Sequence, residues 1–107
     1  MGATLPFRNM TNAQLQAHIR HLAMDSGRVV FTFHAQERMA QRAVSDWEVF
    51  ECLRGGVIQR PPMLDKKTGS LRCRMEHCGS GRNLAVVAAL DDEDPDVVVV
   101  TVMTKTR

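Results

Sequence analysis

Apolar residues recur along the chain at two spacings, and the spacing changes near its middle. In Met10–Asp25 they recur every three or four residues, with Leu15 and Ile19 on one side, which predicts an amphipathic helix. In Leu71–Glu76 they alternate with polar residues, which predicts a strand with one buried face. The pattern therefore predicts helices in the first half of the chain and strands in the second.

Capping signals set the bounds of the predicted helices. Thr11 and Gln14 fit a capping box at the start of the first helix, and Ser45 and Glu48 fit another farther along. Gly55–Gly56 is placed to end the helix that begins at the second box. The predicted helices are Met10–Asp25, which Gly27 ends, His34–Arg42 and Ser45–Arg54, and the β-branched and aromatic segment Arg28–Thr32 is predicted as a strand.

The second half of the chain is rich in strand signals. Leu84–Leu90 and Val97–Met103 are near-continuous apolar runs, as expected of central strands that are buried on both faces. The acidic run around Pro95 joins them most simply as an antiparallel hairpin. Two shorter strands are also predicted, at Val57–Gln59 and Leu71–Glu76, and a polar loop is predicted between them at Leu64–Ser70.

This order, with helices first and strands later, predicts an α+β fold in which amino-terminal helices pack on a mostly antiparallel sheet. A length of 107 residues fits a single domain spanning residues 1–107. No run of ~20 uncharged apolar residues is present, and Met1–Arg8 lacks the apolar core of a secretory signal. We therefore expect a cytoplasmic protein, with no membrane contact, whose three cysteines are reduced thiols.

Charge is distributed unevenly along the chain. The net charge of +2 is too weak to imply a nucleic-acid partner by itself. Basic residues are spread through 28–82, however, whereas acidic residues crowd into Asp91–Asp96. If that acidic run is an exposed turn, the rest of the surface is more basic than the net charge suggests.

The segment FHAQERMAQR, residues 33–42, carries the main candidate site. His34, Arg38 and Arg42 are spaced i, i+4 and i+8, so on a helix they lie along one side. Guanidinium groups bind phosphate oxygens in bidentate fashion, and histidine moves a proton near neutral pH. This line of one imidazole and two guanidinium groups, the His34–Arg38–Arg42 line, suits the binding of a phosphodiester. A neutral His34 would be the base that takes a ribose 2′-hydroxyl proton. The competing interpretation is a histidine that caps or packs and two arginines on a solvated helix face.

Further candidate residues lie on the predicted strands. Arg72 and Arg74 share the polar face of Leu71–Glu76. If that face meets the second helix, the arginines of the strand and of the helix converge. Otherwise the strand face is solvated. Thr101 interrupts a valine run, where a buried hydroxyl needs a partner, although threonine is also a good strand former. Lys105 follows near the end of the chain, where lysines are often frayed.

No metal and no cofactor are expected. Cys73, His77 and Cys78 have a poor spacing for zinc, and Cys73 alternates in phase with the apolar residues of its strand. Gly79–Gly81 does not stand between a strand and a helix, as a phosphate-binding glycine loop would.

The segment FTFHAQERMAQRAVSDWEVFECLRGG resembles the start of DUF4258, a bacterial domain family of unknown function. Its members carry H-x-x-x-R-M-x-x-R-G-(I/V)-S, then a helix and strands that end in V-V-T-V. The resemblance spans Val29–Met103, with Ala43 where the family usually has glycine. That family is similar to the RelE-like toxins, in the fold group of barnase-like and colicin-type ribonucleases, and the element order resembles the motility quorum-sensing regulator toxins, which are mRNA interferases. The matching positions are His34, Arg38, Arg42, Ser45 and Thr101.

The resemblance implies a RelE-like toxin that cleaves RNA, free or ribosome-bound, without a metal ion and that pairs with a cognate antitoxin protein. His34 is then the general base or acid, Arg38 and Arg42 bind the scissile phosphate, and Thr101 orients a group at the site. The alternative is a non-catalytic module that binds RNA or a protein partner with the same face. In the toxin hypothesis, flanking phosphates are held by Arg72, Arg74 and Lys105.

Overall fold

The computed structural model describes residues 5–79 and 82–105. Its helical segments are η1 (Phe7–Asn9), α1 (Asn12–Leu22), η2 (Ser26–Arg28), α2 (Phe33–Arg42) and α3 (Asp46–Gly55). Its strands are β1 (Val29–Phe31), β2 (Val57–Ile58), β3 (Met63–Leu64), β4 (Leu71–Cys78), β5 (Asn83–Asp91) and β6 (Asp94–Lys105). The predicted α+β class is confirmed, because these helices pack on a sheet whose pairings are antiparallel except for that of β1 with β6.

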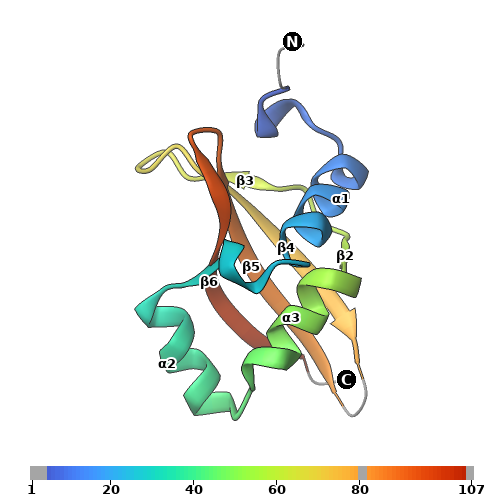
Figure 1. Ribbon diagram of the computed structural model, residues 1–107, viewed down its shortest axis with the longest axis vertical. Coiled ribbons are helices and arrows are strands. Elements are labelled where there is room, and N and C mark those ends of the chain that lie inside the picture. The colour runs from blue at the N-terminus through green and yellow to red at the C-terminus, as the bar shows by residue number, and fades with distance from the viewer. Residues whose placement is uncertain (1–4, 80–81, 106–107) are drawn as a thin grey trace.

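The strands follow the order β1-β6-β5-β4-β2, with β3 also paired to β4 (Figure 1). The antiparallel pairing predicted for the last two apolar runs is confirmed, and both strands lie inside the sheet. Asp91 pairs with Asp94, so the acidic run forms the exposed turn of the β5–β6 hairpin. β3 was not predicted, because Leu64 was assigned to the polar loop Leu64–Ser70.

Helices α1 and α3 pack against one face of the sheet, where the core lies (Figure 1). Met75, Val86 and Val102 form one fully buried row across β4, β5 and β6. The expectation of burial on both faces is confirmed for most of β5, where Ala85 on the opposite face is fully buried. It is wrong for β6, where Val98 on that face stays partly exposed. We call this second surface the open face.

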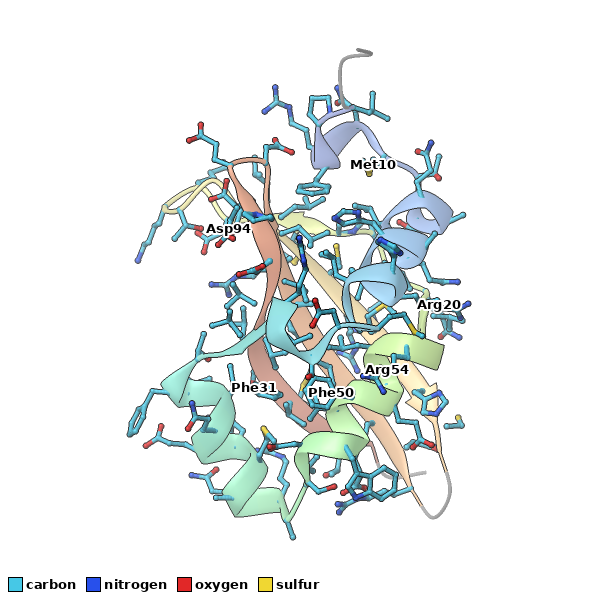
Figure 2. The ribbon with its side chains drawn as sticks, viewed as in Figure 1. Met10, Arg20, Phe31, Phe50, Arg54 and Asp94 are labelled. Carbon is cyan, nitrogen blue, oxygen red and sulfur yellow. The ribbon has the colours of Figure 1, made fainter. Side chains whose placement is uncertain are left out.

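Aromatic side chains join the sheet edge to α3. Phe31 at the end of β1 packs edge-on against Phe50 of α3, with ring centroids 5.9 Å apart, and the two residues face each other in Figure 2. The Arg54 guanidinium lies 5.3 Å from the centre of the Phe50 ring, and its Nε donates to the Ala23 carbonyl over 2.6 Å. These contacts hold α3 to both β1 and the end of α1.

Local signals account for the helix bounds. Both predicted capping boxes, at Thr11 and at Ser45, are present. The first helix is shorter than predicted and ends at Leu22, because the Asp25 side chain accepts from the Gly27 backbone N–H and caps η2 instead. No helix in the described part of the chain is long and apolar enough to cross a membrane.

A β-bulge in β6 decides which way Thr101 points. Val87 pairs with Thr101 but the next residue, Ala88, pairs with Val99, so Val100 has no partner across β5. Strict alternation would have placed Thr101 on the core side with Val99. The extra residue shifts the phase, so Val102 is buried in the core and Thr101 shares the open face with Val87.

Candidate functional site

The start of α2 is attached to β6 beside the bulge. Thr32 is the N-cap of α2: its hydroxyl accepts from the Ala35 N–H over 3.0 Å and donates to the Val100 carbonyl over 3.2 Å. Ala35 and Met39 form the buried stripe of α2, which packs along β6. This attachment fixes His34, in the first turn of the helix, in an exposed position.

His34 and Arg38 contact each other along the exposed side of α2. Arg38 Nε donates to His34 Nε2 over 3.4 Å, and Arg38 Nη1 donates to Gln41 Oε1 over 3.0 Å. Arg42, one turn farther on, is partly exposed, and its guanidinium makes no hydrogen bond within residues 5–79 and 82–105.

The end of α2 is held by a clamp that the sequence did not indicate. Arg82, just before β5, binds Glu48 of α3 in bidentate fashion at 2.8 and 2.7 Å, and it also donates to the backbone carbonyls of Arg42 and Ala43. The hydrogen bonds from Arg82 and from Ser45 lower the pKa of Glu48 to about 2. Ala43 takes the left-handed conformation, with φ 53°, at the helix C-cap. The clamp therefore fixes the turn that follows the His34–Arg38–Arg42 line.

Arg72 and Arg74 lie on the open face, as the alternation predicted. Arg74 pairs with Val87, which pairs with Thr101, so these residues form one row across β4, β5 and β6. Arg72 binds Asp65 over 2.9 Å. Arg74 Nε is buried, lies 3.5 Å from Glu76 Oε2 and has no hydrogen-bond acceptor in the described residues. Buried charged donors of this kind favour an added acceptor.

A pocket of about 710 Å³ opens on this face beside β3. Its lining includes the two predicted arginines together with cations whose position the sequence did not indicate. The apolar part of its wall comes mainly from β3, where Met63 and Leu64 are exposed. The lining residues are Arg60, Pro61, Met63, Leu64, Asp65, Lys66, Lys67, Arg72, Arg74 and Val87.

The structure does not bring all the predicted site residues into contact. β5 separates Arg74 from Thr101, which places β4 and β6 roughly 10 Å apart at ordinary strand spacing. α2 packs on β6, and within the described residues no hydrogen bond or ion pair joins His34, Arg38 or Arg42 to Arg72 or Arg74. The Lys105 backbone pairs with Asn83 at the end of β6, and its side chain lies outside the described part of the chain.

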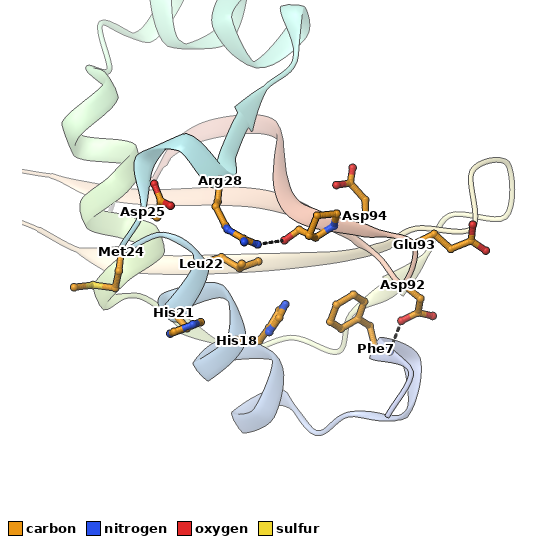
Figure 3. A pocket seen from close by; sticks show the side chains of 11 residues that line it. Phe7, His18, His21, Leu22, Met24, Asp25, Arg28, Asp92, Glu93 and Asp94 are labelled. Atoms are coloured by element: carbon orange, nitrogen blue, oxygen red, sulfur yellow. Dashed lines mark hydrogen bonds between the residues drawn. The ribbon is translucent and has the colours of Figure 1, made fainter. Parts of the chain in front are cut away.

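A second pocket, of about 660 Å³, lies on another side of the molecule and is acidic (Figure 3). The β5–β6 turn contributes Asp92, Glu93 and Asp94, and Asp92 accepts from the Phe7 backbone N–H over 2.9 Å. His18 lines the same pocket, and burial followed by the nearby His21 lowers its pKa, so it carries no compensating charge near neutral pH. Its carboxylates repel phosphate, so this pocket is unsuited to a phosphodiester.

The cysteines are placed for packing. Burial raises the pKa of Cys52 to about 12 and that of Cys73 to about 11, so both thiols stay protonated and unreactive near neutral pH. Cys78 at the end of β4 is exposed. Among the described residues no three His, Cys, Asp or Glu side chains are grouped to hold a metal ion.

The profile of DUF4258, a domain of unknown function, matches residues 31–104. The match contains the His34–Arg38–Arg42 line, the pocket of the open face and the Arg82 clamp, and it ends one residue before the end of β6. No curated protein and no solved structure matches the chain.

Proposed function

The chain belongs to DUF4258, and we propose that it is an RNA-targeting toxin of the RelE-like class that cuts RNA without a metal ion. The contact between His34 and Arg38 in an exposed position on α2 carries the proposal. It joins a group that takes up a proton near neutral pH to a cation that binds phosphate. Family membership assigns no activity by itself, so the proposal depends on these side chains.

His34 is the general base of the proposed reaction. When Arg38 turns from His34 to the phosphate it frees Nε2 of the imidazole, which takes the proton of a ribose 2′-hydroxyl, and that oxygen forms a bond to the adjacent phosphorus. The bond from phosphorus to the 5′-oxygen breaks, and the leaving oxygen receives a proton from the imidazolium or from water. The products are a 2′,3′-cyclic phosphate and a 5′-hydroxyl, and acid–base catalysis of this kind contributes ~10²–10⁴-fold.

Arg38 stabilises the charge that the phosphate gains. Before RNA binds, its Nε and Nη1 contact His34 and Gln41, which keeps the guanidinium beside the base. A preorganised cation of this type acts most strongly on the transition state. Arg42 supplies a second cation one turn away, and Thr101 on the neighbouring β6 orients a group at the site.

The open face would hold the RNA on either side of the scissile phosphate. Arg72 and Arg74 lie across β5 from Thr101, and Lys105 ends β6. An RNA strand that leaves α2 and crosses the sheet meets these cations in turn. As a toxin the protein would act on RNA in the cytoplasm, free or ribosome-bound, and would be neutralised by a cognate antitoxin protein.

The proposal is tested by product analysis. Purified protein is incubated with RNA in EDTA, alone and with ribosomes, and the new ends are mapped. We expect 2′,3′-cyclic phosphate ends or their hydrolysis products and no loss of cutting in EDTA. Arg38→Ala should lose both rate and affinity, because Arg38 contacts the phosphate before and during reaction. Cutting that stops in EDTA, or that leaves 3′-hydroxyl ends, contradicts the mechanism.

One observation favours the second candidate, a non-catalytic module that binds RNA or a protein. The cations of β4 and the line on α2 make no direct contact within the described residues, so they act on one phosphate only if the RNA bridges them. In this alternative the open face binds RNA or a protein partner, and His34 contributes only to the structure of α2. Wild-type protein that binds RNA but cuts none, with or without ribosomes, selects this function.

A further inference from the structure

We infer that the pocket of the open face is a subsite for one guanine nucleotide of single-stranded RNA. The inference rests on the proposed function and adds to it a base preference and a strand form. The pocket has a volume of about 710 Å³. Sites for small organic molecules span roughly 300–1,000 Å³, so the pocket has room for one base with its sugar and phosphate.

One wall of the pocket is apolar and exposed. Met63 is 73 % exposed and Leu64 is 49 % exposed, and Pro61 precedes them. Large apolar side chains that stay exposed beside a cationic surface mark a place where a ligand removes them from water. The flat face of a base suits this wall, because a thioether makes favourable contacts with aromatic rings.

The rest of the pocket carries an excess of hydrogen-bond donors. Its lining has five cationic side chains and one carboxylate, Asp65. Asp65 is already occupied, since Oδ1 accepts from the Lys67 N–H and Oδ2 from Arg72. Within the described residues the buried Nε of Arg74 has no hydrogen-bond acceptor, and it lies 3.5 Å from Oε2 of Glu76. A phosphate next to Arg72 and Arg74 would supply the missing acceptors.

The same donor excess selects among the bases. Guanine presents two acceptors, O6 and N7, on one edge, and arginine binds them in bidentate fashion. Adenine and cytosine present an amino donor there, which faces other donors in this pocket, and uracil presents one acceptor, O4. Arg60 is placed to make this contact, because its side chain is 64 % exposed, its Nε lies 3.8 Å from Glu76, and its guanidinium makes no hydrogen bond within the described residues.

The pocket also determines whether the bound RNA is single-stranded or double-stranded. A base in a duplex is stacked on both faces and paired along one edge, so it does not reach a wall such as that of Met63 and Leu64. A base in a loop or a single strand is free to leave the stack and contact the protein. The subsite therefore requires an unpaired guanine. An acidic peptide with apolar side chains would satisfy the same charges, and it is the competing occupant that the test includes.

The test is binding without cleavage. Each nucleoside 5′-monophosphate, and inorganic phosphate, is titrated into labelled protein and followed by the backbone amide signals of Leu64, Arg72 and Arg74. We expect GMP to bind about tenfold more tightly than AMP or CMP, with UMP between them. Arg60→Gln should remove most of this preference and leave AMP binding unchanged. The matched control Arg28→Gln, which removes a cation at the acidic pocket, should change neither.

Several outcomes overturn the inference. Equal binding of the nucleotides, with inorganic phosphate displacing each of them, reduces the pocket to a phosphate site. Absence of GMP binding, or tighter binding of a short peptide rich in glutamate and leucine, assigns the pocket to a protein partner. The result is separable from the proposed function. Selective GMP binding without RNA cleavage supports the guanine subsite and contradicts the nuclease function. RNA cleavage without a preference for GMP supports the nuclease function and contradicts the guanine subsite.

Discussion

The two faces of the central strands carry opposite chemistry. On the helix-covered face, Met75 and Val86 pair across β4 and β5 and are fully buried. One residue along, Arg74 and Val87 pair on the open face, next to Thr101 of β6. The same strands therefore hold the fold with alternate residues and present cations with the residues between them.

This contrast separates stability from binding. Substitutions on the covered face remove apolar surface from the core, so they should act on the free energy of unfolding. Substitutions on the open face change charge at a surface that is partly exposed, so they should act on ligand affinity and leave folding nearly intact.

The largest effect should come from charge placed on the covered face. Val99 is fully buried and Val98 is partly exposed on the open face, and the two are adjacent in β6. Val99→Asp should unfold the protein, because an unpaired buried charge costs several kcal/mol. Val98→Asp should leave it folded. Chemical denaturation followed by circular dichroism measures both, and equal losses in the two variants would remove the distinction between the faces.

A smaller loss should follow from breaking the clamp beside the covered face. Arg82→Met removes the bidentate contact with Glu48 and the bonds to the α2–α3 turn. We expect the Tm to fall by a few degrees, since these hydrogen bonds involve charged groups. Thermal unfolding measures the change, and a variant as stable as the wild type would show that the turn needs no clamp.

The clamp also predicts a pH dependence. The pKa of Glu48 is about 2 in the folded chain, below its ordinary value of 4.5. Because the folded pKa is lowered, the stabilisation is present above pH 4.5 and is lost as the pH falls toward 2. In Arg82→Met the loss of stability over this window should be smaller. Parallel curves for the wild type and the variant would exclude Glu48 as the cause.

Substitutions on the open face should change RNA affinity and leave the free energy of unfolding nearly unchanged. Arg72 is 46 % exposed and pairs with Asp65 at the surface, so Arg72→Gln should change stability little. It should flatten the slope of log RNA affinity against log salt by roughly 0.7. Arg28→Gln removes the same charge at the acidic pocket and should leave the slope unchanged. A slope that both variants change equally would mean that net charge, not this face, binds RNA.

The smallest effect lies outside both faces, at the end of α2. Ala43 has φ 53°, a conformation that suits glycine, so Ala43→Gly should stabilise the protein by about 1 kcal/mol. Ala40→Gly, in the exposed interior of the same helix, should destabilise it by a similar amount. Differential scanning calorimetry compares them, and a loss in both would show that glycine gains nothing at the C-cap.

Local signals explain how much of the fold was predictable. The capping boxes at Thr11 and Ser45 depend on residues three apart, so the sequence displays them directly. The parallel pairing of Val29 with Val97 depends on residues far apart in the chain and leaves no local pattern. The bulge at Val100 also leaves no local pattern in the sequence, and strict alternation would have buried Thr101.

The candidate site divides in the same way. The His34–Arg38 contact follows from helical spacing, so the sequence was sufficient for it. The pocket could not be predicted without the fold, because Arg60 and Met63 come to line it with Arg74 through the pairing of β2 and β3 with β4. Arg82 lies 34 residues from Glu48, and an arginine in a turn carries no sign of its partner.

The central claim is that His34 moves a proton in RNA cleavage. The most direct measurement is the single-turnover rate of cutting in EDTA by the wild type, His34→Gln and His21→Gln. His21 is an exposed histidine of α1 and serves as the matched control. We expect His34→Gln to lose ~10²–10⁴-fold in rate with RNA affinity and folding retained, and His21→Gln to cut like the wild type. Equal cutting by His34→Gln, or no cutting by the wild type, would contradict the account.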